Sequence, residues 1–162
     1  MNSQQLYQQT KNKTRVVICG DTRKMSIAMV LHVLHYLNRH VDSVLESTSQ
    51  ISLVDDNDFV LIEADENAHE LNANIALLST QINDNKLTTI QFIDSITNGG
   101  ILVYNEEDEV LKKLVEESSK PIQKYPYQTP KHTLENDVVF LNTNEGKLPL
   151  KITQNNLENL MG

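Results

Sequence analysis

The chain has 162 residues, a net charge of −8 at neutral pH and a single cysteine. Its length favours one domain with one apolar core, the negative charge argues against a nucleic-acid-binding surface, and a single thiol excludes an internal disulfide. No apolar stretch reaches the roughly 20 residues that span a bilayer, and residues 1–10 lack the apolar core of a targeting signal, so we expect a cytoplasmic protein that binds neither nucleic acid nor a membrane.

Residues 1–13 form a polar N-terminal segment. We expect this segment to fray, apart from a helical turn over Gln4–Gln9. The predicted domain then occupies residues 14–162.

The stretch Arg15–Asn38 contains a strand, a turn and a helix in succession. Val16–Ile18 is an apolar run without alternation, as in a parallel strand buried on both faces, and Cys19 beside it is most simply a small buried hydrophobic residue. After the turn Gly20–Lys24, apolar residues recur at helical spacing and predict a helix that packs on the sheet. A strand that ends in glycine and opens into a helix is typical of anion-binding loops, because a helix N-terminus presents unpaired N–H groups to phosphate.

Strand and helix patterns alternate through the middle of the chain. Strands are predicted at Val41–Glu46, Phe59–Ile62, Ile75–Leu78 and Ile101–Tyr104, and helices at Lys86–Ile96 and Glu107–Ser118. The polar stretch Ser47–Asp58 is predicted to be a connection. This alternation favours an α/β fold in which helices flank a mostly parallel sheet.

The last third of the sequence has a different pattern. Residues 125–132 predict an irregular passage, and Val138–Asn142 and Lys147–Ile152 predict a late β-hairpin around a turn that contains Gly146. The segment Gln154–Met161 begins a helical pattern.

Three carboxylates follow one of the predicted strands. Glu63, Asp65 and Glu66 come directly after Phe59–Ile62, at the carboxyl edge where open α/β sheets place metal ligands. A polar strand exit that leads into a helix start explains the same residues without a metal. His32 and His35 are one helical turn apart, and we interpret them as surface residues because no third ligand is evident near them in the sequence.

Four stretches make the chain resemble the central, ATP-binding domain of the Mur ligases. They are Gly20-Asp21-Thr22-Arg23-Lys24, Phe59–Glu66 (FVLIEADE), Ser95–Asp108 (SITNGGILVYNEED) and residues 155–159 (NNLEN). Within that family the chain is most similar to the type that joins a tripeptide to UDP-N-acetylmuramate in peptidoglycan recycling. The resemblance covers nearly the whole chain.

The resemblance implies an ATP-dependent amide-bond ligase with ATP and Mg²⁺ as cofactors. Such a ligase transfers the γ-phosphate to a carboxylate, after which an amine displaces phosphate from the acyl phosphate. By position, Lys24 would hold the β and γ phosphates, Glu63 would ligate Mg²⁺ and Asn159 would approach the adenine. Gly20, Asp21 and Thr22 would complete the phosphate loop.

The sequence departs from the family pattern at the loop itself. The family turn reads G-[TS]-H-G-K-[TS], but Arg23 takes the place of its second glycine and Met25 that of its last hydroxyl residue. A side chain at the first position obstructs phosphate, and a thioether cannot replace a hydroxyl on Mg²⁺. Ser26 replaces that hydroxyl only if the turn shifts by one residue. The family's Asp-His pair becomes Asp84-Asn85.

These departures leave three functional hypotheses. The first is a stand-alone, truncated relative that cannot catalyse ligation alone, since the flanking domains for the UDP-sugar and the amine are expected to be absent. The second is a functional nucleotide-binding domain that acts with partner chains, with Ser26 and Glu63 on the metal. The third, an unrelated phosphate-loop kinase, is disfavoured because Ile18 stands where its first glycine belongs.

The predicted ligand and oligomeric state follow from the same residues. With Arg23 beside Lys24, the loop could bind a phosphate or sulfate without the family's nucleotide geometry, although a tight strand-to-helix turn with a solvated lysine explains Gly20 and Lys24 equally well. Apolar surface left uncovered where flanking domains belong makes a homodimer plausible.

Overall fold

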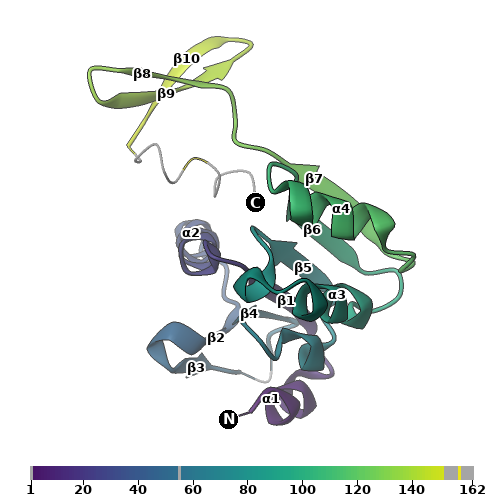
Figure 1. Cartoon of the computed structure of the whole chain (residues 1–162). Coiled ribbons are helices and arrows are strands. Elements are labelled where there is room, and N and C mark those ends of the chain that lie inside the picture. Colours follow the sequence, from purple (N-terminus) through teal and green to yellow (C-terminus); the bar gives the residue numbers. More distant parts are fainter. Residues whose placement is uncertain (1, 55, 152–156, 158–162) are drawn as a thin grey trace.

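A seven-stranded sheet in the order β3-β2-β4-β1-β5-β6-β7 forms the main body of this computed structural model (Figure 1). The structure describes residues 2–54, 56–151 and 157. The strands of this sheet are β1 (Thr14–Cys19), β2 (Asp42–Leu45), β3 (Gln50–Ser52), β4 (Phe59–Glu63), β5 (Ile75–Leu78), β6 (Ile101–Asn105) and β7 (Gln123–Tyr127). All neighbours pair in parallel except β3, which is antiparallel to β2. The predicted α/β fold with a mostly parallel sheet is therefore confirmed.

Helices cover the two faces of this sheet unequally. One face carries α2 (Arg23–Tyr36), and the other carries α1 (Ser3–Thr10), α3 (Lys86–Ser95), α4 (Glu109–Glu117) and the 3₁₀ turn η2 (Ala68–Leu71). Two further 3₁₀ turns, η1 (Glu46–Thr48) and η3 (Ile82–Asp84), follow β2 and β5. Because β1 leads to one face while β4 and β5 lead to the other, the carboxyl end of β1 is a topological switch point, where α/β sheets bind ligands.

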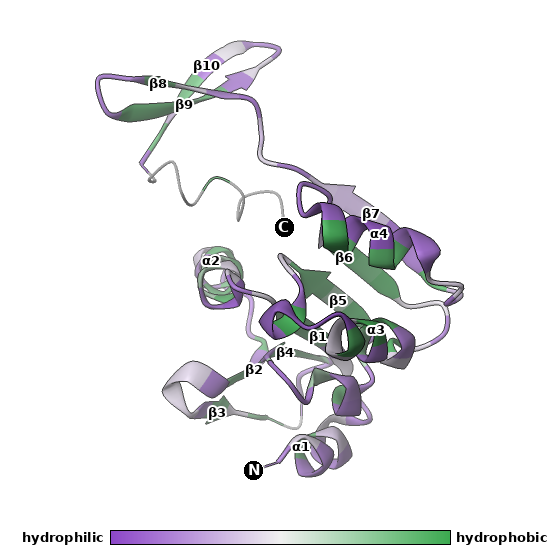
Figure 2. Ribbon diagram, viewed as in Figure 1, coloured by the Kyte–Doolittle hydropathy of each residue, from purple (hydrophilic) through white to green (hydrophobic). Residues whose placement is uncertain are grey.

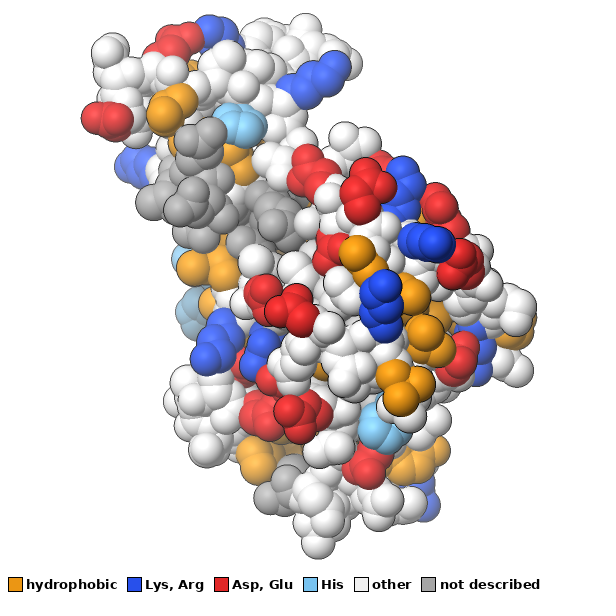
Figure 3. Space-filling view, viewed as in Figure 1, with side chains coloured by type: hydrophobic (Ala, Val, Ile, Leu, Met, Phe, Trp, Pro, Cys, Tyr) orange, Lys and Arg blue, Asp and Glu red, His pale blue; other side chains and the backbone are white. Residues whose placement is uncertain are grey.

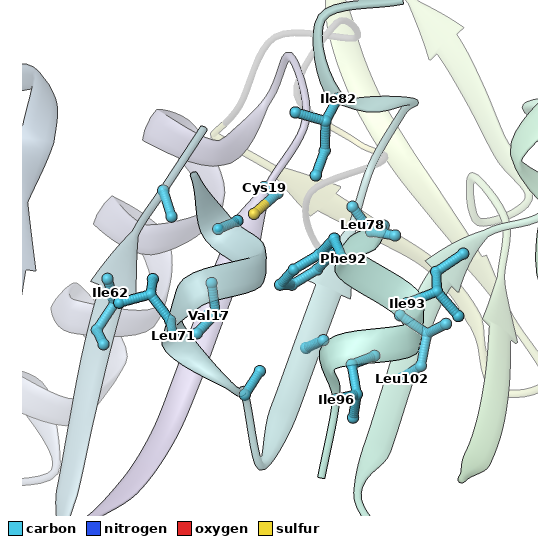
Figure 4. Close-up of a cluster of buried hydrophobic side chains, with 14 of the residues drawn as sticks. Val17, Cys19, Ile62, Leu71, Leu78, Ile82, Phe92, Ile93, Ile96 and Leu102 are labelled. Atoms are coloured by element: carbon cyan, nitrogen blue, oxygen red, sulfur yellow. The ribbon is translucent and has the colours of Figure 1, made fainter. Parts of the chain in front are cut away.

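The two faces of the sheet take alternate residues of the same strands. Val17 and Cys19 belong to the larger core with Phe92, whereas Ile18 packs with Ile27 on the α2 side. Figure 4 shows the Phe92 ring among apolar side chains from β1, β5 and the segments beside them. In Figure 2 strands β5 and β6 are coloured mainly as hydrophobic. The prediction of strands buried on both faces is confirmed.

Helix α2 packs on the sheet as predicted, but its apolar arc is only partly covered. Ile27 is buried, whereas Val33 and Tyr36 are 53% and 83% exposed. The predicted packing of this helix on the sheet is confirmed, and Val33 and Tyr36 lie on the part of α2 that faces away from the sheet.

Two strands of the main sheet were missed by the sequence patterns. The passage around Tyr125 and Pro126 was predicted to be irregular, yet it forms the edge strand β7, which pairs in parallel with β6. Proline is tolerated there because an edge strand leaves half of its backbone groups without a partner strand. Strand β3 lies within the stretch predicted to be a connection, and it too is an edge strand.

A separate antiparallel sheet follows β7. Its strands are β8 (His132–Glu135), β9 (Val138–Thr143) and β10 (Gly146–Leu150), in the order β10-β9-β8. The predicted hairpin is confirmed as β9 and β10, and β8 adds a third strand. Figure 1 shows this small sheet projecting away from the main one. The predicted helix over Gln154–Met161 lies outside the described residues except for Leu157, which is buried.

The N-terminal segment is anchored to the domain instead of fraying. Asn2 and Gln5 form a capping box at the start of α1, and Leu6 and Thr10 are buried. After α1, the Lys13 ammonium lies 2.9 Å from the Asp42 carboxylate and donates to the Val54 and Asn57 carbonyls. The helical turn predicted over Gln4–Gln9 is a short helix, Ser3–Thr10, in the structure. In the part of the chain that the structure describes, every helix is too short or too polar to span a bilayer.

The ion pair between Lys13 and Asp42 generates the first prediction. Lys13→Met leaves the fully buried Asp42 carboxylate without its cation, and the loss of one partner of a buried pair costs roughly 3–5 kcal/mol. The exposed neighbour Lys11 gives the control, because Lys11→Met should change stability by about 0.5 kcal/mol or less. Urea unfolding of the two variants measures both effects, and equal midpoints would contradict the assignment.

The same carboxylate predicts a pH dependence. Burial opposes ionisation of Asp42, but hydrogen bonds from Asn57 and Lys13 outweigh it and lower the pKa of Asp42. A lowered folded-state pKa stabilises the fold above the unfolded pKa of about 3.9, and this contribution is lost as pH falls through the folded value. The difference in unfolding free energy between the wild type and Asp42→Asn should therefore shrink as pH falls below about 4. A difference that stays constant from neutral pH to acid would contradict this.

Candidate functional site

The loop between β1 and α2 lies at the switch point of the sheet. Gly20 adopts a positive φ of 98°, and a Cβ on it would lie 2.4 Å from Ser79 Oγ and 2.7 Å from the Thr80 nitrogen. Only glycine fits this position, because the backbone passes directly over the end of β5. The predicted tight strand-to-helix turn is thereby confirmed.

Two N–H groups of this loop donate to side-chain hydroxyls within the protein. Asp21 N–H donates to Thr80 Oγ1 over 3.0 Å, and Thr22 N–H donates to Ser79 Oγ over 3.2 Å. Phosphate-binding loops instead leave such N–H groups pointing at the anion. The two hydroxyls after β5 therefore satisfy donors that a phosphate would otherwise use.

Ser79 and Thr80 were missed by the sequence analysis. The signal that could have found them is their position: they follow Ile75–Leu78 directly and so reach the same sheet edge as the loop. Side-chain hydroxyls next to a strand end are common in loops, and nothing in their spacing alone marks them as loop partners.

Arg23 is the first residue of α2, and its side chain turns back across the loop. Its Nη1 donates to the Gly20 carbonyl over 3.1 Å, and its Nη2 donates to Asp65 Oδ2 over 2.8 Å. Its Nε lies 3.7 Å from Glu63 Oε1, which is an ion pair and too long for a hydrogen bond. The guanidinium thus joins the loop to both carboxylates at the end of β4.

Glu63 is the most buried acid of this site. Its side chain is 1% exposed, and its Oε2 accepts from both the N–H and the hydroxyl of Ser47, over 3.1 and 2.7 Å. Its Oε1 has no hydrogen-bond donor among the described residues, so Arg23 is its nearest cation. Glu66, the third carboxylate, instead accepts from Asn83.

The other predicted loop residues do not converge on a common point. Lys24 and Met25 are exposed. Ser26 is 3% exposed, and its hydroxyl donates to the Thr22 carbonyl within the first turn of α2. Asn159 lies outside the described residues.

The remaining candidates have structural positions. Asn85 caps α3 by accepting from Leu87 and Thr88, and burial raises the pKa of the Cys19 thiol, as expected of a buried small residue. His32 and His35 are exposed on α2. Within the described part of the chain, no three His, Cys, Asp or Glu side chains are grouped as metal ligands.

A cavity of about 340 Å³ lies beside the carboxylates, between α1, the segment after β2 and η2. Its lining includes Glu46, Glu63, Asp65 and Glu66, with Leu6 and Ile62 among its apolar residues. On the face seen in Figure 3, Lys and Arg side chains lie among Asp and Glu side chains and form no continuous basic patch over the described residues. The surroundings of the site are thus predominantly acidic, with Arg23 and Lys24 as the cations of the loop.

Solved structures with a similar fold include several Mur ligases. The MurF of Acinetobacter baumannii has a TM-score of 0.70 at 12% identity and covers 97% of this chain. The UDP-N-acetylmuramate:L-alanyl-gamma-D-glutamyl-meso-diaminopimelate ligase of Neisseria meningitides has a TM-score of 0.67 at 13% identity and also covers 97%. The MurF of Thermotoga maritima, solved in complex with ADP, has a TM-score of 0.66 at 12% identity and covers 98%.

The TM-scores show that this chain has the fold of these Mur ligase domains, and at identities of 12–13% they show the fold alone. The chain spans 44%, 62% and 46% of the three proteins, in the order given. No family model and no curated protein matches the sequence.

The close approach at Gly20 predicts a specific loss of stability. Gly99 also has a positive φ, but a Cβ on it would meet nothing within 4 Å, so Gly99→Ala measures backbone strain alone. Gly20→Ala adds the contact with Ser79 and Thr80, and overpacking of this kind costs about 1–3 kcal/mol beyond the strain. Denaturant unfolding of the two variants should show that difference, and equal losses would contradict the contact.

Proposed function

We propose that this chain is a Mur-ligase-like domain, related to the ATP-dependent ligases of peptidoglycan recycling, that does not catalyse amide-bond formation by itself. The observation that carries the proposal is the state of the loop: the N–H groups of Asp21 and Thr22 donate to hydroxyls of the same chain, and Arg23 faces the nearby carboxylates. The fold supports the proposed relation to Mur ligases. The contacts of the loop support the proposal that the chain does not catalyse amide-bond formation by itself.

The residues of the loop do not fit a nucleotide with Mg²⁺. Thr80 and Ser79 accept from the N–H groups of Asp21 and Thr22, so phosphate would have to displace them. The Arg23 side chain lies across the turn where close approach of phosphate needs a bare backbone.

The metal ligands are affected in the same way. The family's hydroxyl position is held by Met25, whose thioether is a poor ligand for a hard cation. Ser26 donates to its own helix turn, and Glu63 and Asp65 face a guanidinium. A Mg²⁺ ion would need oxygen ligands that these contacts occupy.

The chain matches less than two thirds of the length of each of these Mur ligases, so the amide-bond-forming activity of the whole proteins is not carried over to it. We propose that this domain acts as a binding or assembly module.

Thermal unfolding with and without millimolar ATP and Mg²⁺ tests the proposal. A ligand at about 100 times its dissociation constant adds roughly 2.7 kcal/mol to the unfolding free energy, a shift that is easily measured. We expect no shift for the wild type. A shift that disappears in Lys24→Ala would overturn the proposal in favour of a functional ATP- and Mg²⁺-binding domain that acts with partner chains.

A further inference from the structure

The end of β4 places a buried negative charge beside the start of α2. The Glu63 side chain is 1% exposed, and Ser47 satisfies only its Oε2. A carboxylate in such a position is stable as an anion only when a cation or several donors face it, because burial removes its hydration. The second oxygen of Glu63 therefore defines a place that requires positive charge.

Arg23 supplies that charge to two carboxylates at once. Its Nε lies 3.7 Å from Glu63 Oε1, and its Nη2 lies 2.8 Å from Asp65 Oδ2. The adjacent cation, Lys24, is exposed, and none of the ion pairs found among the described residues includes it. The pairing is specific to residue 23 and is not a general property of a basic loop.

The oxygen atoms around the guanidinium are those that a small divalent cation would choose. Mg²⁺ and Mn²⁺ bind one or two carboxylates together with neutral oxygens and water, and this site offers Glu63, Asp65 and the Gly20 carbonyl. We infer that the Arg23 guanidinium takes the place of a divalent cation between Glu63 and Asp65, so that the domain has an internal, permanent counter-ion instead of an exchangeable metal.

This inference rests on the proposed function and extends it, because it gives the two carboxylates a role that requires no metal. A fixed counter-ion faces the buried Glu63 carboxylate and, through its contacts with Glu63 and Asp65, holds the start of α2 against the end of β4. The inference also makes a specific prediction: after removal of the Arg23 side chain, the oxygen atoms that faced it should bind a divalent cation.

Mn²⁺ binding to the full chain, without nucleotide, tests the inference. The six-line electron paramagnetic resonance signal of free Mn²⁺ is titrated against the wild type, Arg23→Ala, Lys24→Ala and the double variant Arg23→Ala with Glu63→Gln. We expect Arg23→Ala to bind one Mn²⁺ at least about tenfold more tightly than the wild type. Lys24→Ala, which removes an equal charge from the next position, should behave as the wild type. The double variant should lose the gain.

Thermal unfolding of the same proteins gives a second readout. Arg23→Ala should unfold several degrees below the wild type in the absence of divalent ions and recover in millimolar Mn²⁺, whereas the wild-type midpoint should not change. Where Arg23→Ala does not fold, Arg23→Gln retains side-chain volume without the charge and takes its place.

Three results would overturn the inference. They are Glu63-dependent Mn²⁺ binding by the wild type, folded Arg23 variants that bind no Mn²⁺, and Arg23 variants that stay unfolded in Mn²⁺. None of them involves ATP, so the proposed function stands or falls separately on the nucleotide experiment.

Discussion

The contact of Arg23 with Glu63 and Asp65 is the constraint on which the rest of the site depends. A carboxylate as buried as Glu63 would be costly without a cation, and the guanidinium provides one from the first residue of α2. Through Nη1 the same side chain also holds the Gly20 carbonyl. The end of β4, the loop after β1 and the start of α2 are therefore fixed relative to one another by one side chain.

Sequence patterns were sufficient for the elements that are buried on both faces. The run Ile75–Leu78 was predicted with the bounds that β5 has, and α3 was predicted to within one residue. The sequence patterns failed at the two edges of the sheet. Strand β7 contains Pro126, and all three residues of β3 are exposed, so neither strand has the run of apolar residues that is typical of a buried strand. Edge strands are held by backbone hydrogen bonds to a neighbour, and the side-chain pattern of the strand itself does not report that neighbour.

The location of the candidate site at the sheet edge was predictable from the sequence, but the contact between Arg23 and Glu63 was not. That Gly20–Lys24 and Glu63 would lie at the same edge follows from the parallel arrangement of the strands, which the alternation of strands and helices predicts. Sequence reasoning regarded Arg23 as an obstruction to phosphate and Glu63 as a ligand for metal. It did not join the two, because the direction of a side chain at the first position of a helix depends on where that helix begins and on which strand lies beside it.

The retention of a nucleotide-loop shape does not require a nucleotide. In this chain the turn is determined by Gly20 against β5, by two hydroxyls that accept the loop N–H groups, and by the guanidinium that neutralises the carboxylates. Each of these contacts comes from within the fold. Similarity of the backbone to Mur ligases, one of which is solved with ADP, shows the architecture alone, and an affinity for nucleotide does not follow from it. In a scaffold of this kind, the residues that face the loop are the better guide to ligand binding, because they report whether its donors and charges are still free.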